Sequence, residues 1–315
     1  MRRPTSVFLL AALGAVIVFQ TAARAADVAS IKTAVQRSAE SLRSGYGYFV
    51  RAYVPSPYTE KITREEVAAN ESKGVRKLLP DDMRSVDRFY WAFDGPKWRF
   101  DRNRMFPKSG CGSLAQVAWD GSRGTGLTCD GGFVSNDMSA TRLYALIGMM
   151  DAFFGYERKW IINGSFAYAG DEELDGITTH HLVVRQQSVT RDIWVSPSHG
   201  YLTKRMRSTP DPGKGILSIY DVQSFRQYGD TWFPEVATEI DYPERDGQRQ
   251  GADITRYRTL EFHANVDIPE WVFSVRFPVG MTIYGPEPGK ESQIGGTVTK
   301  EELEAFLKPA AVDTR

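Results

Sequence analysis

The side chains best suited to metal or acid–base chemistry are the histidines, and the chain has 4 of them. His180 and His181 are neighbours in a predicted strand, where adjacent side chains point to opposite faces and cannot share a metal without a bulge. His199 lies in a Ser-Pro-Ser-His-Gly turn, and His263 ends a predicted strand. We interpret all of these histidines as surface or hydrogen-bonding residues.

Other catalytic patterns are missing from the sequence. It contains no HExxH, no GxSxG and no Walker lysine motif. The segment Gly121–Gly132 (GSRGTGLTCDGG) is rich in glycine, but no GK[ST] follows it, which favours turns over a phosphate loop. Acidic residues are abundant, and no pair stands out as a glycosidase dyad. We therefore expect no catalytic residues, no cofactor and no metal site.

The chain has 2 cysteines, Cys111 and Cys129. In an oxidising compartment two thiols in neighbouring segments are expected to pair. The loop they would close, about 18 residues, corresponds to about 3 kcal/mol in the chain-entropy model. A reactive or metal-binding thiol is the alternative, although no histidine lies near them to complete a metal site.

The amino terminus has the pattern of a signal peptide. Arg2 and Arg3 precede the apolar run Val7–Phe19, and Ala23-Arg24-Ala25 supplies small residues for cleavage. The run is shorter than the roughly 20 residues that span a bilayer as a helix, and no second run of that kind follows. We expect residues 1–25 to be removed and the mature protein to be exported, soluble and periplasmic, without a transmembrane segment.

The charge balance argues against a nucleic-acid partner. The whole chain has 39 basic and 39 acidic residues, and removal of Arg2, Arg3 and Arg24 leaves 36 basic residues and a net charge of −3. Binding to a phosphate backbone requires clustered positive charge. The 42% hydrophobic and 12% aromatic residues instead predict a sizeable core.

The elements are mostly strands. An amphipathic helix is predicted over 27–44, a strand over Tyr46–Val54, and a charged, solvated insertion with helical stretches over about 55–85. Asp-Gly, His-Gly and Gly-Asp pairs then separate short apolar segments, as in antiparallel hairpins. Further strands are predicted at 86–94, 97–103, 115–120, 123–129, 165–173, 178–186, 189–195, 201–207, 216–226, 232–242 and 252–264. In the strand 232–242 we expect one face to be dry and the other wet. The dry face carries Trp232, Val236, Thr238, Ile240 and Tyr242, and the other carries Glu235, Glu239 and Asp241.

One helical segment breaks this pattern. Thr141–Phe154 (TRLYALIGMMDAFF) is apolar on most of its surface, so it must face a dry environment on more than one side. It is either a lid over an apolar cavity or a core helix packed permanently under the sheet. A short helix is also predicted at Val298–Leu307.

These features together resemble the LolA-like outer-membrane lipoprotein carrier and sorting proteins. The resemblance rests on the order of elements and on Val117-Ala118-Trp119-Asp120-Gly121, Ile193–Leu202 (IWVSPSHGYL), Gly229–Pro234 (GDTWFP) and Ile268–Tyr284 (IPEWVFSVRFPVGMTIY). It implies a mainly β fold with a few helices (α+β), an unclosed, strongly bent antiparallel β-barrel with an N-terminal helix and a helical lid. The domain would run over 26–290, followed by a short helix and tail at 291–315.

The resemblance also implies a function in carrying lipoprotein acyl chains or lipid in an apolar cavity. The candidate lipid-binding residues are those of the lid, namely Leu143, Leu146, Ile147, Met150, Phe153 and Phe154. The alternative is a non-enzymatic envelope sensor or scaffold that binds a protein partner, since a carrier has no need of the insertion at 55–85. In the carriers a sheet arginine helps to hold the lid; Arg99, Arg102, Arg185 and Arg191 are candidates, and no motif selects one.

Overall fold

The structure is a computed structural model whose contacts divide the chain into two compact units. Unit 1 contains residues up to 41 and 155–221, and unit 2 contains residues 42–154 and those from 222 onward. Whether the two units fold as one domain over 26–290 stays a prediction. The structure describes residues 28–71, 84–105, 112–128, 131–138, 153, 158–186, 188–210, 217–242, 244–245, 248–249, 251–277, 282–284 and 291–293.

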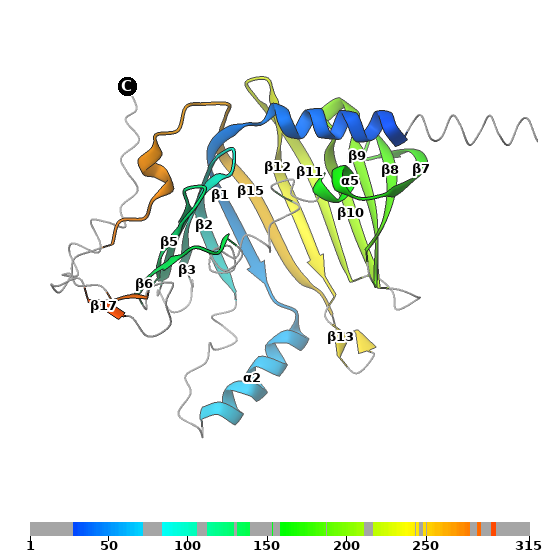
Figure 1. Cartoon of the computed structure of the whole chain (residues 1–315). Coiled ribbons are helices and arrows are strands. Elements are labelled where there is room, and N and C mark those ends of the chain that lie inside the picture. Colours follow the sequence, from blue (N-terminus) through cyan, green and yellow to red (C-terminus); the bar gives the residue numbers. More distant parts are fainter. Residues whose placement is uncertain are drawn as a thin grey trace, which may run out of the picture. The chain divides into compact units, whose positions relative to one another are not determined.

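The main element is an unclosed, mostly antiparallel sheet, which confirms the predicted fold class (Figure 1). In unit 2 the strand order is β17-β16-β6-β5-β4-β3-β2-β1-β15-β12-β11, and in unit 1 it is β11-β10-β9-β8-β7. The strands of unit 2 are β1 (Ser44–Val54), β2 (Ser85–Asp94), β3 (Lys97–Met105), β4 (Gly112–Trp119), β5 (Gly124–Thr128), β6 (Gly131–Ser135), β12 (Thr231–Asp241), β15 (Asp253–Ala264), β16 (Thr282–Tyr284) and β17 (Glu291–Gln293). Those of unit 1 are β7 (Phe166–Leu174), β8 (Ile177–Gln186), β9 (Val189–Ser196) and β10 (Leu202–Pro210), and β11 (Ser218–Tyr228) runs from unit 1 into unit 2. A separate hairpin consists of β13 (Glu244–Arg245) and β14 (Gln248–Arg249).

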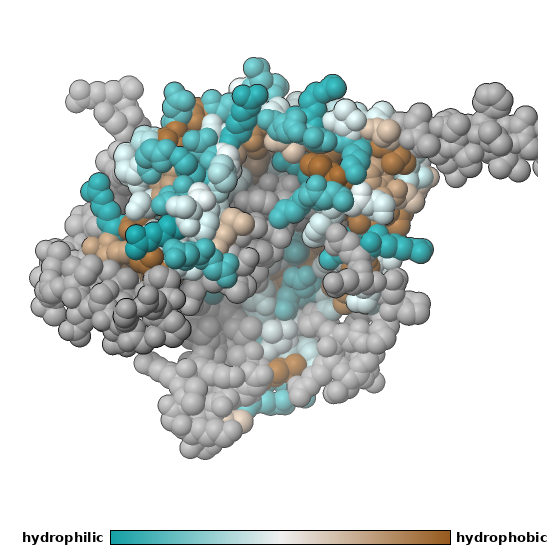
Figure 2. Space-filling view, in the orientation of Figure 1, coloured by the Kyte–Doolittle hydropathy of each residue, from teal (hydrophilic) through white to brown (hydrophobic). Residues whose placement is uncertain are grey.

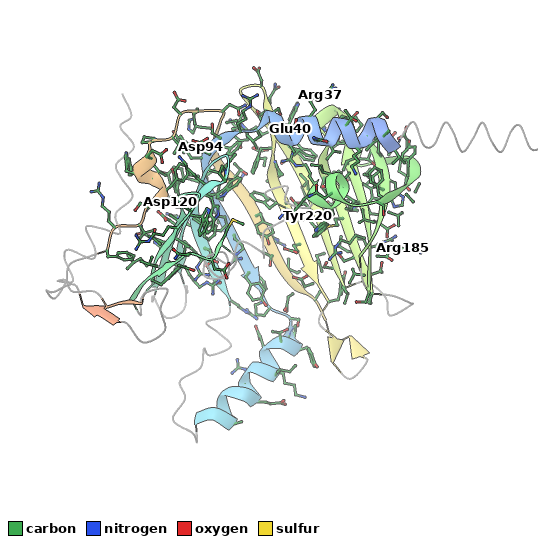
Figure 3. The ribbon with its side chains drawn as sticks, viewed as in Figure 1. Arg37, Glu40, Asp94, Asp120, Arg185 and Tyr220 are labelled. Carbon is green, nitrogen blue, oxygen red and sulfur yellow. The ribbon has the colours of Figure 1, made fainter. Side chains whose placement is uncertain are left out.

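The hairpins turn where the sequence predicted. Asp175 and Gly176 have φ angles of 52° and 77° between β7 and β8, as a type I′ turn requires. Asp94 and Asp120, both labelled in Figure 3, lie where the Asp-Gly turns after β2 and β4 begin. Asp120 accepts hydrogen bonds from the backbone N–H groups of Ser122 (2.8 Å) and Arg123 (2.7 Å).

Unit 1 has two layers. The helix over 28–41 and α5 (Arg158–Asn163) pack on one face of β7–β10, and Ile31, Val35 and Ile161 are buried there. Ser38 donates to the carbonyl oxygen of Gly200 and Lys32 donates to that of Gly164 (3.3 Å), which fixes the helix on the sheet. No helix in the part of the chain that the structure describes is long and apolar enough to cross a membrane.

A lysine is buried inside the sheet of unit 1. Lys204 is the extra residue of a β-bulge in β10, since Thr203 pairs with Val195 and Arg205 pairs with Trp194. Its side chain is 1% exposed, and its ammonium lies 2.7 Å from Asp175 Oδ2 and 3.5 Å from Asp221 Oδ1. The hydrogen bond from Lys204 lowers the pKa of Asp175.

Strand β7 is an edge of the sheet, since it pairs with β8 alone among the described strands. Its pairing shifts register between Tyr168 and Gly170, and Gly170 has a φ of 129°. Three consecutive acidic residues, Asp171, Glu172 and Glu173, follow this bulge and are exposed.

The predicted insertion contains α2 (Pro57–Glu71), and residues 72–83 lie outside the described residues. Asp253 of β15 anchors the first turn of α2, because it accepts hydrogen bonds from Ser56 N (2.6 Å), Thr59 Oγ1 (3.0 Å) and Tyr53 Oη (3.0 Å). Burial and the Asp253 carboxylate raise the pKa of Tyr53.

Candidate functional site

An aromatic cluster lies on one face of unit 2, which we call the inner face. Phe49 of β1 stacks on Phe89 of β2 with ring centroids 6.0 Å apart, and Phe89 lies 5.5 Å from Phe100 of β3. On the other side of Phe49, Phe233 of β12 is 5.9 Å away, and Phe233 stacks on Phe262 of β15 at 4.4 Å. These five rings are almost completely buried.

The inner face follows from alternation along each strand. Phe49 lies opposite Phe89, and Gly47 lies opposite Trp91, so every second residue of β1 and β2 points to the same side. Gly47 makes room for the rings, because a Cβ there would lie 2.6 Å from the carbonyl oxygen of Glu261 and 2.7 Å from the ring of Phe49. The packing of the aromatic rings therefore requires a glycine at position 47.

Phe153 is the one predicted lid residue within the described part of the chain. Its side chain is 1% exposed and packs into the aromatic cluster. It meets Phe49 and Phe233 edge-on, at 5.7 Å and 5.6 Å, and stacks on Tyr257 at 5.2 Å. The carboxyl end of the oily segment 141–154 thus contributes a ring to the inner face.

The other predicted site residues lie outside the described residues. They are Leu143, Leu146, Ile147, Met150 and Phe154 of the lid, and Cys111 and Cys129 of the predicted disulfide. The helix predicted at 298–307 and the signal peptide at 1–25 also lie outside them. These assignments stay predictions.

A charged cluster adjoins the rings on the inner face. Asp87 is two residues from Phe89, and its carboxylate accepts hydrogen bonds from Arg51 Nε (3.1 Å) and from Arg104 Nε (2.8 Å) and Nη2 (3.1 Å). The side chains of Arg51 and Asp87 are 5% and 1% exposed. Burial alone would raise the pKa of Asp87, but the hydrogen bonds and positive charges of Arg104 and Arg51 lower it.

These charged residues were missed at the sequence level. The arginines considered there included Arg99, which pairs with Asp101, and Arg191, which lies 4.2 Å from the Trp160 ring centroid. The signal that was missed is the alternation of side chains along each strand. Arg51 is two residues from Phe49, and Asp87 is two residues from Phe89, so all four side chains point to the same face. A charge in register with a row of buried rings needs a partner on the neighbouring strand.

Strand β12 differs from the sequence prediction. Phe233 and Ala237 are its most buried apolar residues, whereas Trp232, Val236 and Ile240 are half-buried. The dry face is therefore the one that also carries Glu239, and its carboxylate is tolerated there because Tyr257 Oη donates to it at 2.7 Å. The alternation predicted the period of this strand correctly and its dry face wrongly.

The histidines form hydrogen bonds, as predicted. His180 pairs with Asp171, and His181 lies between Glu172 (2.7 Å from Nδ1) and Asp192 (3.0 Å from Nε2) while stacking on Trp194 at 4.4 Å. No group of three or more His, Cys, Asp or Glu residues that could hold a metal occurs among the residues described by the structure.

Figure 2 shows one face of the molecule in which hydrophilic residues cover most of the described surface and the hydrophobic patches are small and separate. The large apolar residues with substantial exposure in the described part are Val54, Met138, Leu260 and Trp271. Among the described residues of unit 2, the large aromatic side chains gather mainly in the buried cluster on the inner face.

The chain matches no family model and no curated protein. It is similar to the structure of a DUF1329 family protein from Desulfovibrio piger, with 12% identity and a TM-score of 0.41 over 78% of this chain and 97% of that chain. It is also similar to the Mycobacterium tuberculosis lipoprotein LppX (10% identity, TM-score 0.29, 77% and 98% covered). A third similar structure is MucB in complex with MucA(peri) (8% identity, TM-score 0.21, 76% and 100% covered). At these values the likenesses concern the fold and carry no argument about function.

Proposed function

We propose that this chain is an exported, non-enzymatic carrier of the LolA-like type, which holds the acyl chain of a lipoprotein or lipid against the aromatic cluster of the inner face. The observation that supports the proposal is the position of Phe153, a ring from the oily segment 141–154 inserted among rings of β1, β12 and β15. In this proposal Phe153 occupies the place of the ligand when none is bound.

Two magnitudes set the scale of such an exchange. Burying a phenylalanine side chain is worth about 1.5–3 kcal/mol. An acyl chain of about 16 carbons loses about 0.8 kcal/mol per CH₂ on leaving a membrane, near 13 kcal/mol in all. A ligand that replaces Phe153 keeps the rings of the inner face covered, and its own burial has to exceed what the displaced Phe153 ring loses.

The test compares two buried phenylalanines. Phe153→Ala removes the ring from the inner face, and Phe273→Ala is the matched control, because Phe273 is also 1% exposed but packs with Ala92 and Val272 on the opposite face. The protein is incubated with palmitate-bearing lipopeptide, and bound acyl species are measured by native mass spectrometry and by displacement of a fluorescent fatty acid.

The proposal predicts acyl binding by the wild type and tighter binding by Phe153→Ala, with Phe273→Ala close to the wild type. Absence of acyl binding in the folded wild type would contradict the proposal. An equal change in both variants would place the ligand elsewhere.

The second candidate function is a non-enzymatic envelope scaffold that binds a protein partner. Helix α2 favours it, because Lys61 and Glu65 are 75% and 61% exposed on its surface and the anchor to Asp253 holds only its first turn. Charge reversal at these two positions would abolish capture of a partner while leaving acyl binding unchanged. A change in acyl binding without a change in partner capture, in Phe153→Ala, would separate the two functions.

A further inference from the structure

Three arginines lie close together on the outer face of unit 2, which is the face opposite the aromatic cluster. Val50 of β1 points to this face, because it follows the buried Phe49. Arg88 of β2 and Arg258 of β15 lie opposite Val50 on its two sides, so their Cα atoms are about 10 Å apart. Arg256 points to the same side as Arg258 and lies about 7 Å from it along β15. We call Arg88, Arg256 and Arg258 the arginine patch.

The charges of the arginine patch are not neutralised within the described part of the chain. All three side chains are exposed, and none forms a salt bridge or a side-chain hydrogen bond with another described residue. Two carboxylates of the same face have partners of their own, since Asp101 pairs with Arg99 and Glu261 pairs with His263. The patch is therefore a local excess of positive charge in a chain with equal numbers of basic and acidic residues, 39 of each.

Apolar side chains of the same face lie between and beside the arginines. Val50 is half-buried between Arg88 and Arg258, and the half-buried Val236 of β12 lies opposite Arg258 on the other side. Leu260, two residues after Arg258, is 52% exposed, and Val54 at the end of β1 is 45% exposed. The outer face thus presents positive charge and exposed apolar surface together.

We propose that the arginine patch binds the surface of a membrane that contains anionic phospholipid. A guanidinium group donates two parallel hydrogen bonds to a phosphate, and clustered basic residues are attracted to the negative potential of such a membrane. Long arginine side chains keep their charged ends at the level of the headgroups while neighbouring apolar side chains enter the layer beneath. Val54 and Leu260 favour a membrane over a soluble anion, because a soluble anion gains nothing from them.

This inference goes beyond acyl carriage and does not rest on it. The arginine patch and the aromatic cluster lie on opposite faces of the same strands, so a protein that binds no acyl chain can still bind a membrane surface. The two proposals therefore fail separately.

The test measures sedimentation of the mature protein with vesicles at low and at high salt. One set of vesicles contains phosphatidylglycerol and phosphatidylcholine in equal parts, and the other contains phosphatidylcholine alone. Arg256→Gln/Arg258→Gln removes two charges from the patch. The matched control is Arg37→Gln/Arg185→Gln, which changes the net charge equally at two exposed arginines of unit 1, both labelled in Figure 3.

Two further measurements separate a membrane from other anions. Leu260→Ser removes an exposed apolar side chain and leaves the charge of the patch unchanged. Glycerol phosphate and polyglutamate are added as competitors, because they represent the headgroup without its bilayer and an acidic protein segment. Thermal unfolding of each variant shows that it is folded.

We expect binding to the anionic vesicles, loss of binding on phosphatidylcholine alone, and weaker binding at high salt. Arg256→Gln/Arg258→Gln should weaken binding about fivefold for each charge removed, and Leu260→Ser should weaken it about twofold to tenfold. Arg37→Gln/Arg185→Gln should bind like the wild type.

The inference is overturned if the anionic vesicles are not bound, or if the control variant loses as much as the patch variant. It is also overturned if Leu260→Ser binds unchanged, or if glycerol phosphate or polyglutamate displaces the vesicles, because the occupant would then be a soluble anion or an acidic protein. Phe153→Ala should bind the vesicles like the wild type, and Arg256→Gln/Arg258→Gln should bind the palmitate-bearing lipopeptide like the wild type. These two results distinguish a failure at the outer face from a failure of the carrier proposal.

Discussion

The ring of Phe153 stacks on the ring of Tyr257, with centroids 5.2 Å apart and planes inclined by 23°. The hydroxyl of the same Tyr257 donates to Glu239. Tyr257 therefore takes part both in the apolar packing of the inner face, through its ring, and in a hydrogen bond, through its hydroxyl.

Phe153→Ala is expected to lower the free energy of unfolding by about 3–5 kcal/mol, because it deletes a ring buried on three sides. Urea denaturation measures the loss. The space left among Phe49, Phe233 and Tyr257 is apolar, so benzene is expected to raise the melting temperature of this variant and not that of the wild type. An unchanged melting temperature with benzene would mean that the cluster collapses into the space.

Asp87→Asn is expected to destabilise the protein by about 3–5 kcal/mol, because it leaves the buried Arg51 guanidinium without its carboxylate. Since the pKa of Asp87 is lowered in the folded state, its stabilisation is complete above the ordinary aspartate pKa of about 4 and is lost as the pH falls through the lower folded value. Urea denaturation between pH 6 and pH 2 would show this loss in the wild type. The Asp87→Asn variant should lack this contribution, and an identical pH profile would contradict the assignment.

Lys204 and Asp175 are expected to respond asymmetrically to substitution. Asp175→Asn leaves the buried ammonium of Lys204 with less compensating charge, so the melting temperature should fall. Lys204→Met keeps the volume of the side chain and leaves Asp175, which is 64% exposed, to water, so the melting temperature should be equal or higher. A larger loss in Lys204→Met than in Asp175→Asn would show that the ion pair itself stabilises unit 1.

Asp253→Ala is expected to release the first turn of α2, because Thr59 and the preceding Ser56 lose their acceptor. Hydrogen exchange of the amides over 57–71 should become faster, while that of β1 and β15 changes little. Glu261→Ala, on the same strand, is the control, since its recorded partner is His263 and not α2. Equal protection of α2 in the wild type and Asp253→Ala would mean that other contacts hold the helix.

Most strands were predictable because turn chemistry and alternation act locally. The strands predicted at 97–103, 189–195 and 252–264 appear as β3, β9 and β15 with ends shifted by at most two residues. Strand β6 (Gly131–Ser135) was not predicted, since GGFVS has glycines that favour a turn. Its backbone pairs with the adjacent β5 and, in parallel, with β16, and the pairing with β16 joins segments that are far apart in the sequence.

The candidate site was predictable only in part, for the same reason. The oily character of 141–154 pointed to Phe153, but which rings surround it depends on strand register. The ion pair of Arg51 and Asp87 is likewise visible only after β1 and β2 are paired, when the two residues fall opposite each other. Sequence reasoning gives the period of each strand, whereas the buried face and the alignment between strands depend on partners that the period does not specify.

The acidic, bulged border at β7 has a consequence for how the chain behaves at high concentration. Main-chain pairing between two copies along β7 would bring Asp171, Glu172 and Glu173 against the same charges of the second copy, and the kink at Gly170 would interrupt the ladder. Self-assembly into extended fibrils is therefore discouraged at this border, and a macromolecule that meets unit 1 there must recognise its side chains and not extend its sheet.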